Sequence, residues 1–302
     1  MNPYQTFVTD FARFMQQAKS YPLGGFPTPA RPAPVPEAPR VLIFSPHPDD
    51  EVIIGALPLR LLRELRWNVI NVAVTQGSNP ARQQDRWKEL QACCEYIGFG
   101  LLAMRENGLE GINLETRARK SAEWSRAVER IAEILSDQKP RVIFFPHDDD
   151  WNITHIGTHH LVVDALGRLG EAFACHVVET EFWGAMDTPN LMVESGEQDI
   201  IDLITALTFH VGEVKRNPYH VRMAAWLMDN VRRGSELVGG QGGAAPDFLF
   251  GTLYRLRRWR KGRFAPVLER GQFVSKTDGV RELFAHLHDA SSRNTDAHLE
   301  SK

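Results

Sequence analysis

Two short segments of the sequence concentrate histidine and carboxylate side chains. Residues 45–51 read Ser-Pro-His-Pro-Asp-Asp-Glu, and residues 147–160 hold four histidines and three aspartates. Carboxylates packed this closely repel one another unless a cation lies among them, and a divalent metal is the simplest candidate. Three histidine and carboxylate ligands from the two segments would leave a fourth position for water, which is the pattern of catalytic zinc sites.

The first segment holds more possible ligands than one ion needs. In an extended turn His47 and Asp49 project differently from Asp50, so the three side chains are not expected to bind one metal together. One carboxylate would then remain beside an activated water, which is the arrangement of a metal-dependent hydrolase. In the second segment, residues 147–150 are either a solvated acidic loop or the source of a carboxylate that orients a histidine ligand.

Both segments follow short apolar runs that are typical of buried strands. The predicted strands are 41–45, 68–74, 101–104, 142–145 and 176–182, and the predicted helices between them are 53–66, 81–96, 116–136 and 157–169. This alternation predicts an α/β fold with a mainly parallel sheet, and we expect a three-layer sandwich core. The strands of such a sheet end at one edge, so the two polar segments can meet there.

The flanking regions have a different character. Residues 4–18 predict an amphipathic helix that packs on the domain, with a partner-binding helix as the alternative, and residues 21–39 hold seven prolines and predict an extended connector. Further helices are expected at 197–214 and 219–233. The predicted organisation is an N-terminal helix and proline-rich arm (1–40), a catalytic domain (41–265) and a C-terminal extension (266–302) whose polar end is disordered.

Composition restricts the possible partners. The formal net charge of −3 gives no reason to expect nucleic acid, and the sequence shows neither a signal peptide nor an apolar run of membrane-spanning length. Three cysteines do not form a disulfide framework, so we expect a cytoplasmic protein. The basic run 255–263 is interpreted as a solvated strand face, with a patch for a phosphorylated substrate as the alternative.

Residues 45–51 resemble the (A/S)HPDDE motif of the PIG-L/LmbE-like N-acetylglucosaminyl deacetylases. These are metal-dependent enzymes, usually with zinc, and they have a Rossmann-like fold. Residues 75–77 and 85–89 fall where the family has its second-strand loop and following helix, and the resemblance covers roughly residues 41–260. It implies that His47 and Asp50 are metal ligands and that Asp49 is the general base.

The resemblance also assigns residues in the second segment. Residues 152–155 match the segment that ends in the family's third metal ligand, which makes His155 that ligand in preference to His159. The family often has a histidine where this chain has Asn152. An asparagine can hydrogen-bond an oxyanion but cannot supply a proton. The proton for the leaving amine would then come from Asp49, or from a substitute. The candidate substitutes are His159, His220 and His147.

Two further positions are predicted to touch the substrate. Arg86 is assigned by similarity alone, and Trp183 either walls the pocket or packs in the core. The expected activity is hydrolysis of an N-acyl amide, with the N-acetyl group of an amino sugar such as N-acetylglucosamine, or of a glycoconjugate, as the first choice. The alternatives are an amidase for a larger N-acyl or thiol-conjugate substrate, and a sugar- or nucleotide-binding protein without turnover. A second copy of the chain, in a homo-oligomer, is the other candidate partner.

Overall fold

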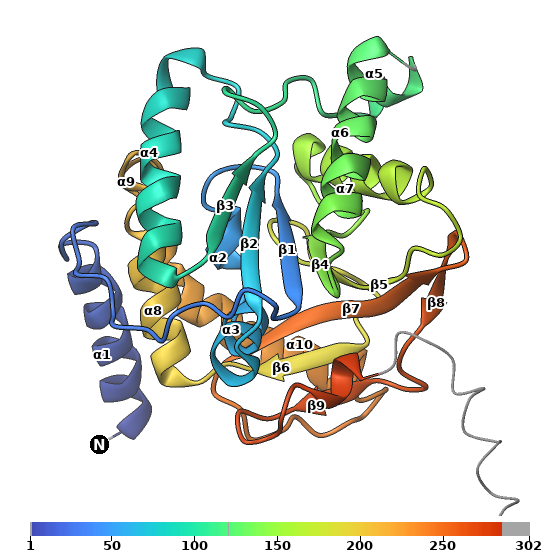
Figure 1. The fold of residues 1–302 in the computed structure, drawn as a ribbon. Coiled ribbons are helices and arrows are strands. Elements are labelled where there is room, and N and C mark those ends of the chain that lie inside the picture. Colours follow the sequence, from blue (N-terminus) through green and yellow to red (C-terminus); the bar gives the residue numbers. More distant parts are fainter. Residues whose placement is uncertain (1, 120, 286–302) are drawn as a thin grey trace, which may run out of the picture.

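A sheet of nine strands runs through the computed structural model, which describes residues 2–119 and 121–285 (Figure 1). The strand order is β3-β2-β1-β4-β5-β7-β6-β9, and β8 pairs with β7. The first five strands are parallel: β1 (Arg40–Ser45), β2 (Asn68–Ala73), β3 (Gly100–Ala103), β4 (Val142–Pro146) and β5 (Cys175–Thr180). The predicted α/β fold with a mainly parallel sheet is confirmed.

The rest of the sheet is mixed. It consists of β6 (Leu191–Glu194), β7 (Gly251–Arg260), β8 (Arg263–Pro266) and β9 (Gln272–Val274). The long strand β7 runs antiparallel to β5, β6 and β8, whereas β9 runs parallel to β6. The sequence analysis missed β6, β8 and β9, because runs of three or four residues are too short to show a period of two. Strand β9 extends the sheet beyond residue 265.

Helices cover both faces of the sheet and give it two large cores, beside a smaller third cluster. Val41 and Ile43 of β1 point into one core and Leu42 into the other, as expected when side chains alternate along a strand. The first core is closed mainly by α3 (Leu57–Leu65), α4 (Pro80–Ile97) and α8 (Glu197–Leu207), and the second mainly by α6 (Ala122–Gln138) and α7 (Ile153–Leu166). This is a three-layer sandwich.

Several predicted helices are interrupted or shifted. The helices concerned are α2 (Asp50–Ile53) before α3, α5 (Leu114–Ala118) before α6, α9 (Val211–Arg216) after α8, and the 3-10 helix η1 (Tyr219–Arg222) before α10 (Met223–Leu237). The break between α2 and α3 lies at Gly55, which has φ +81° and no room for a side chain, since a Cβ there would lie 2.1 Å from Thr252 Oγ1. The helix predicted from 157 starts at Ile153 because the Asn152 side chain accepts a hydrogen bond from the backbone of Thr154.

The N-terminal helix α1 (Pro3–Ala18) forms as predicted but packs less than predicted. None of its residues is buried, and Phe7, Phe11 and Phe14 are between 45% and 67% exposed. The proline-rich connector is extended, and Leu23 in it packs against the first core. The last fifteen residues lie outside the described ranges. Within those ranges, no helix has both the length and the apolar character that crossing a membrane requires.

Candidate active site

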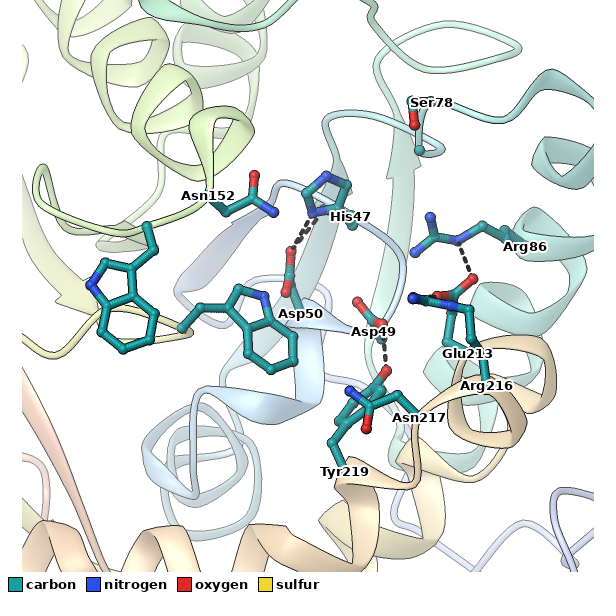
Figure 2. Close-up of a pocket in the computed structure, with 13 residues that line it drawn as sticks. His47, Asp49, Asp50, Ser78, Arg86, Asn152, Glu213, Arg216, Asn217 and Tyr219 are labelled. Carbon is teal, nitrogen blue, oxygen red and sulfur yellow. Dashed lines mark hydrogen bonds and ion pairs between the residues drawn. The ribbon is translucent and has the colours of Figure 1, made fainter.

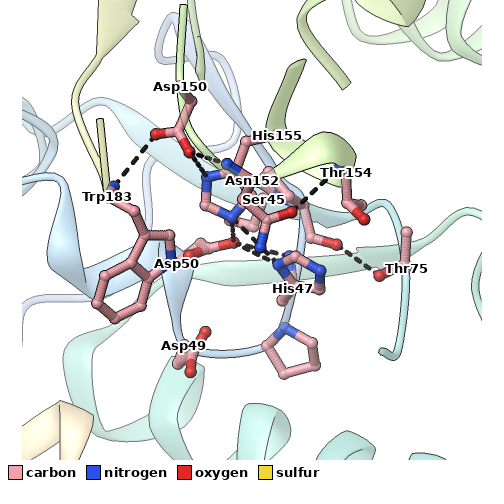
Figure 3. A network of polar contacts seen from close by, with 12 residues as sticks. Ser45, His47, Asp49, Asp50, Thr75, Asp150, Asn152, Thr154, His155 and Trp183 are labelled. Atoms are coloured by element: carbon pink, nitrogen blue, oxygen red, sulfur yellow. Dashed lines mark hydrogen bonds and ion pairs between the residues drawn. The ribbon is translucent and has the colours of Figure 1, made fainter. Parts of the chain in front are cut away.

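The two polar segments meet at one edge of the sheet because β1 and β4 are parallel neighbours. His47 and Asp50 come from the turn after β1, and His155 comes from the first turn of α7. His47 Nδ1 and His155 Nε2 lie 3.2 Å apart. Asp50 Oδ2 lies 3.3 Å from His47 Nδ1 and 3.2 Å from His155 Nε2 (Figure 3). The three donor atoms therefore converge on one point.

The size and chemistry of this group suit a divalent metal. Zinc–nitrogen and zinc–oxygen bonds of 2.0 to 2.2 Å in a tetrahedron place the ligand atoms about 3.3 Å apart. The three separations between His47, Asp50 and His155 match that edge length. Two imidazoles and one carboxylate are ligands that zinc prefers. These three residues could hold such an ion without rearrangement.

A carboxylate lies behind His155. His155 is fully buried, and Asp150 Oδ1 lies 3.6 Å from its Nδ1, on the opposite side of the ring from Asp50. The other oxygen of Asp150 accepts hydrogen bonds from the backbone of Trp183 and Gly184, each 3.1 Å long (Figure 3). Burial alone would lower the pKa of His155, but Asp50 and Asp150 outweigh it and raise this pKa to about 10.

Asp49 stands apart from the three converging residues and faces the cavity. Its backbone is left-handed, with φ 115°, and its N–H donates to Glu51 Oε2 at 2.9 Å. The Tyr219 hydroxyl donates to Asp49 Oδ2 at 2.5 Å (Figure 2). Burial, reinforced by the neighbouring Asp50, raises the pKa of Asp49 to about 7. A carboxylate with this pKa can accept and return a proton near neutral pH.

A buried pair of side chains, Glu51 and His210, supports the turn that carries Asp49. Glu51 Oε1 lies 2.7 Å from His210 Nε2, and both side chains are fully buried. The Cys93 thiol lies close enough for the three residues to resemble a second metal-binding group. Burial and then Glu51 raise the pKa of the Cys93 thiol well above its usual value. The hydrogen bond between Glu51 and His210 accounts for this group without a metal.

A cavity of about 440 Å³ opens in front of the converging residues (Figure 2). It is lined by His47, Asp49, Asp50, Gly77, Ser78, Arg86, Trp151, Asn152, Trp183, Glu213, Arg216, Asn217 and Tyr219. Arg86 donates to the Pro48 carbonyl at 2.9 Å, and Glu213 forms ion pairs with Arg86 and Arg216. Gly77 has φ +82° and lies under the guanidinium of Arg86, where a Cβ would collide with it. Charged and hydrogen-bonding groups therefore dominate the cavity.

The predicted site residues divide into two groups. Arg86, Asn152 and Trp183 line the cavity together with the converging residues. His159 and His220 do not line it. His159 Nδ1 lies 3.0 Å from the Pro146 carbonyl and its ring packs on Phe145, whereas His220 is buried in η1.

His147, the third predicted proton donor, does not line the cavity either, and both of its ring nitrogens have hydrogen-bond partners. His147 Nε2 lies 2.9 Å from the Gly184 carbonyl, and its Nδ1 accepts from the backbone of Asp149 at 3.2 Å. Tyr219 does reach Asp49, but the sequence analysis missed it. It belongs to no motif, and only its position directly before His220 gave any signal.

The sequence matches a known protein family over the part that carries the converging residues. Residues 42–166 match the family described as PIG-L: GlcNAc-PI de-N-acetylase. The resemblance to the PIG-L family is confirmed. The PIG-L match includes His47, Asp49, Asp50 and His155, and it ends before Trp183 and Tyr219. No curated protein matches the sequence.

Solved structures share the fold of this chain at low sequence identity. The N,N'-diacetylchitobiose deacetylase from Pyrococcus horikoshii is 16% identical with a TM-score of 0.52, and the match covers 85% of this chain and 93% of that chain. The teicoplanin deacetylase Orf2, in its zinc-inhibited form, is 14% identical with a TM-score of 0.51 over 73% and 98%. The 4-carboxy-2-hydroxymuconate hydratase from Pseudomonas putida KT2440 is 16% identical with a TM-score of 0.53 over 77% and 99%. Because one of them is a hydratase, the fold alone does not decide the reaction.

Proposed function

We propose that this protein is a metal-dependent hydrolase that removes an N-acyl group, in the first place N-acetyl, from an amino sugar or glycoconjugate. The observation that carries the proposal is the position of Asp49. Its carboxylate lies beside the three converging residues, is not one of them, and faces a polar cavity. The family match and the two deacetylases of the same fold support this choice over a hydratase.

His47, Asp50 and His155 would hold the metal, which we propose to be Zn²⁺ because of the ligand types and their spacing. Such an ion, when bound, polarises an amide carbonyl and lowers the pKa of a water molecule. Asp150 keeps the ring of His155 turned so that Nε2 faces Asp50.

The residues around the ligands carry the proton transfers. Asp49 accepts a proton from the attacking water as the new C–O bond forms. The amide nitrogen of Asn152, whose oxygen caps α7, is available as a donor to the developing oxyanion. Asp49 then returns the proton to the departing nitrogen as the C–N bond breaks. This role falls to Asp49 because Asn152 has no proton to give and none of the three candidate histidines lines the cavity.

The polar walls suit a hydroxylated substrate. Arg86, Arg216 and Glu213 offer charged hydrogen-bonding groups, and Ser78 and Asn217 offer neutral ones. Trp183 provides an aromatic surface at the same cavity. Sugars are bound by this combination of several directional polar contacts with an aromatic side chain.

An amine-release assay over N-acylated sugars tests the proposal. We expect the zinc-loaded protein to release amine from N-acetylglucosamine or its oligomers, and Asp49→Asn to lower kcat about 10² to 10⁴-fold with unchanged zinc content. The matched control is Asp149→Asn, because Asp149 is an exposed aspartate in the second polar segment. If no N-acylated sugar yields amine with the metal-loaded wild type, the hydrolase proposal is wrong and a binding protein of the same fold is favoured.

Metal analysis tests the third ligand separately. We expect His155→Ala to lose most of the bound zinc, because His155 supplies one of the three converging atoms. His159→Ala should retain it, because the His159 ring is directed to the Pro146 carbonyl one helical turn away. The zinc content of both purified variants is measured by atomic emission spectroscopy. The opposite result, with loss in His159→Ala only, would assign the ligand to His159.

A further inference from the structure

A second cavity adjoins the candidate active site. It has a volume of about 290 Å³, and Trp183, Asn217 and Tyr219 line both this cavity and the first one. Its remaining walls are Ile53, Phe182, Leu207, Arg222, Met223 and Trp226. We call it the apolar cavity. Tyr219 lines the apolar cavity and donates a hydrogen bond to Asp49, so only this side chain separates the apolar cavity from Asp49.

The two cavities differ in chemistry. Apart from Asn217 and Arg222, the side chains around the apolar cavity are aliphatic or aromatic, whereas the first cavity carries two arginines and three carboxylates. The apolar walls also reach the metal-binding group itself. Ile53 lies one helical turn after Asp50 on α2, and the Phe182 ring packs edge-on against His155 with 4.7 Å between ring centroids. An apolar group that extends from a carbonyl at the metal-binding group would therefore meet these walls.

We propose that the apolar cavity binds the acyl half of the substrate, as an alkyl or aryl acyl group longer than acetyl. This proposal rests on the proposed function. An amide has two halves, and the amine half of an amino sugar carries hydroxyl groups that suit Arg86, Arg216 and Glu213. The acyl half then lies on the other side of the carbonyl, toward Trp183 and Tyr219, which are the side chains that the two cavities share.

Chain length should control affinity if this assignment is right. Each methylene group that moves from water into an apolar site strengthens binding roughly fourfold, and incomplete burial reduces this gain. We therefore expect N-octanoylglucosamine to bind at least about tenfold more tightly than N-acetylglucosamine. Titration calorimetry measures this with the full-length, zinc-loaded Asp49→Asn protein, so that turnover does not consume the probes.

A pair of methionines on α10 supplies a matched control. Met223 is buried and lines the apolar cavity, whereas Met228 on the same helix is 41% exposed and lines neither cavity. Met223→Trp should reduce the gain from the octanoyl chain to less than about threefold, and Met228→Trp should preserve it. If Met223→Trp fails to fold in a thermal melt, Trp226→Ala replaces it. This change removes an apolar wall and should weaken octanoyl binding more than acetyl binding.

A second probe separates the acyl half from the other end of the sugar. Octyl N-acetylglucosaminide carries an alkyl chain of similar length on the glycosidic oxygen, and we expect it to gain little affinity. Equal affinity along the acyl series would overturn the proposal, and so would a gain for the octyl glycoside alone.

Amine release by the wild type, assayed in parallel, separates this proposal from the proposed function. Octanoyl preference without release would refute only the hydrolase. Release without chain-length preference would refute only the apolar acyl site.

Discussion

Asp49 adopts a backbone conformation that L-residues rarely take, and two contacts hold it there. A left-handed non-glycine residue of this kind costs on the order of 1–3 kcal/mol and persists only where its surroundings fix it. The Glu51 carboxylate binds the Asp49 N–H, and the Tyr219 hydroxyl binds its side chain. Asp49 is thus oriented before a substrate arrives, which is what efficient proton transfer requires.

The Tyr219 hydroxyl is the part of this arrangement that can be removed most cleanly. A hydrogen bond to a charged group contributes about 1.5–3 kcal/mol, so Tyr219→Phe should lower kcat roughly 10- to 150-fold. KM should change little, because the aromatic ring of the cavity wall remains. Steady-state amine release measures both constants, with the exposed Tyr21→Phe as the control. A raised KM with unchanged kcat would show instead that Tyr219 binds substrate.

The sequence predicted the site residues that lie in motifs, and it missed the residues that only tertiary packing brings to the site. His47, Asp49, Asp50 and His155 stand directly after two predicted strands, and the parallel sheet brings them together. Tyr219 lies 170 positions from Asp49 in the chain, and His210 lies 159 positions from Glu51. No local pattern records such contacts, because they depend on how the later helices return to the sheet.

Helix α9 is linked to the turn after β1 by one buried ion pair. His210 directly precedes α9, and its Nε2 lies 2.7 Å from Glu51. Glu51 in turn binds the Asp49 backbone. The position of α9, which carries Glu213 and Arg216 of the first cavity, is therefore coupled to the orientation of Asp49, the proposed general base.

We expect His210→Gln to lower stability by about 3 kcal/mol, because it leaves a buried carboxylate without its charged partner. Burial alone would lower the pKa of His210, but Glu51 outweighs it and raises this pKa. A raised folded-state pKa stabilises the protein fully below the ordinary pKa of about 6.5, and this contribution is lost as pH rises through the folded-state value. The free energy of unfolding of the wild type should therefore exceed that of the variant by more at about pH 6 than at about pH 9.

Urea unfolding at both pH values measures this difference, and His160→Gln, outside the site, is the control. The variant should also lose kcat with little change in KM, because it loosens Asp49 without touching substrate. Equal stability of variant and wild type at about pH 6 would rule out a charged pair.

At the scale of elements, the long strands and helices were predictable and their interruptions were not. Strands β1 and β4 have continuous apolar runs, β2 and β5 have shorter apolar stretches, and β7 shows an alternation of apolar and basic residues. The break at Gly55 depends on Thr252, which lies two hundred residues away, and Tyr254 also takes part. Its hydroxyl donates to the Ile54 carbonyl at 2.5 Å. Such breaks are set by tertiary contacts that helical periodicity cannot show.

A partly buried ion cluster links the parallel part of the sheet to its antiparallel part, where β5 meets β7. Glu179 on β5 is fully buried and forms 2.6 Å ion pairs with Arg255 and Arg257 on β7. Arg255 also binds Asp148 in the second polar segment. Arg255 and Arg257 of the basic run 255–263 therefore form ion pairs with a buried carboxylate, and the predicted solvated strand face does not describe these two residues.

Glu179→Gln should lower the free energy of unfolding by about 3 kcal/mol, because two half-buried arginines lose their common partner. The control is Glu133→Gln in a surface pair with Arg130, where both side chains are about half exposed and the expected loss is at most about 1 kcal/mol. Urea titrations of both variants compare them. Losses of equal size would show that the cluster does not hold the two halves of the sheet together.

The origin of the apolar cavity has a consequence for how this protein can change. The three converging residues and Asp49 all come from residues 42–166, whereas the apolar walls, apart from Ile53, come from residues 182–226. Under the proposed function, the residues that act on the bond and most of the residues that select the acyl group thus lie in separate stretches of the chain, although Tyr219, which contacts Asp49, belongs to the later one. Substitutions in the later stretch can accumulate, or be selected in the laboratory, and alter which acyl group is accepted while the bond-breaking residues stay untouched. A library at Leu207, Arg222, Met223 and Trp226, which leaves His210 and Tyr219 unchanged, is accordingly the most direct route to new substrates.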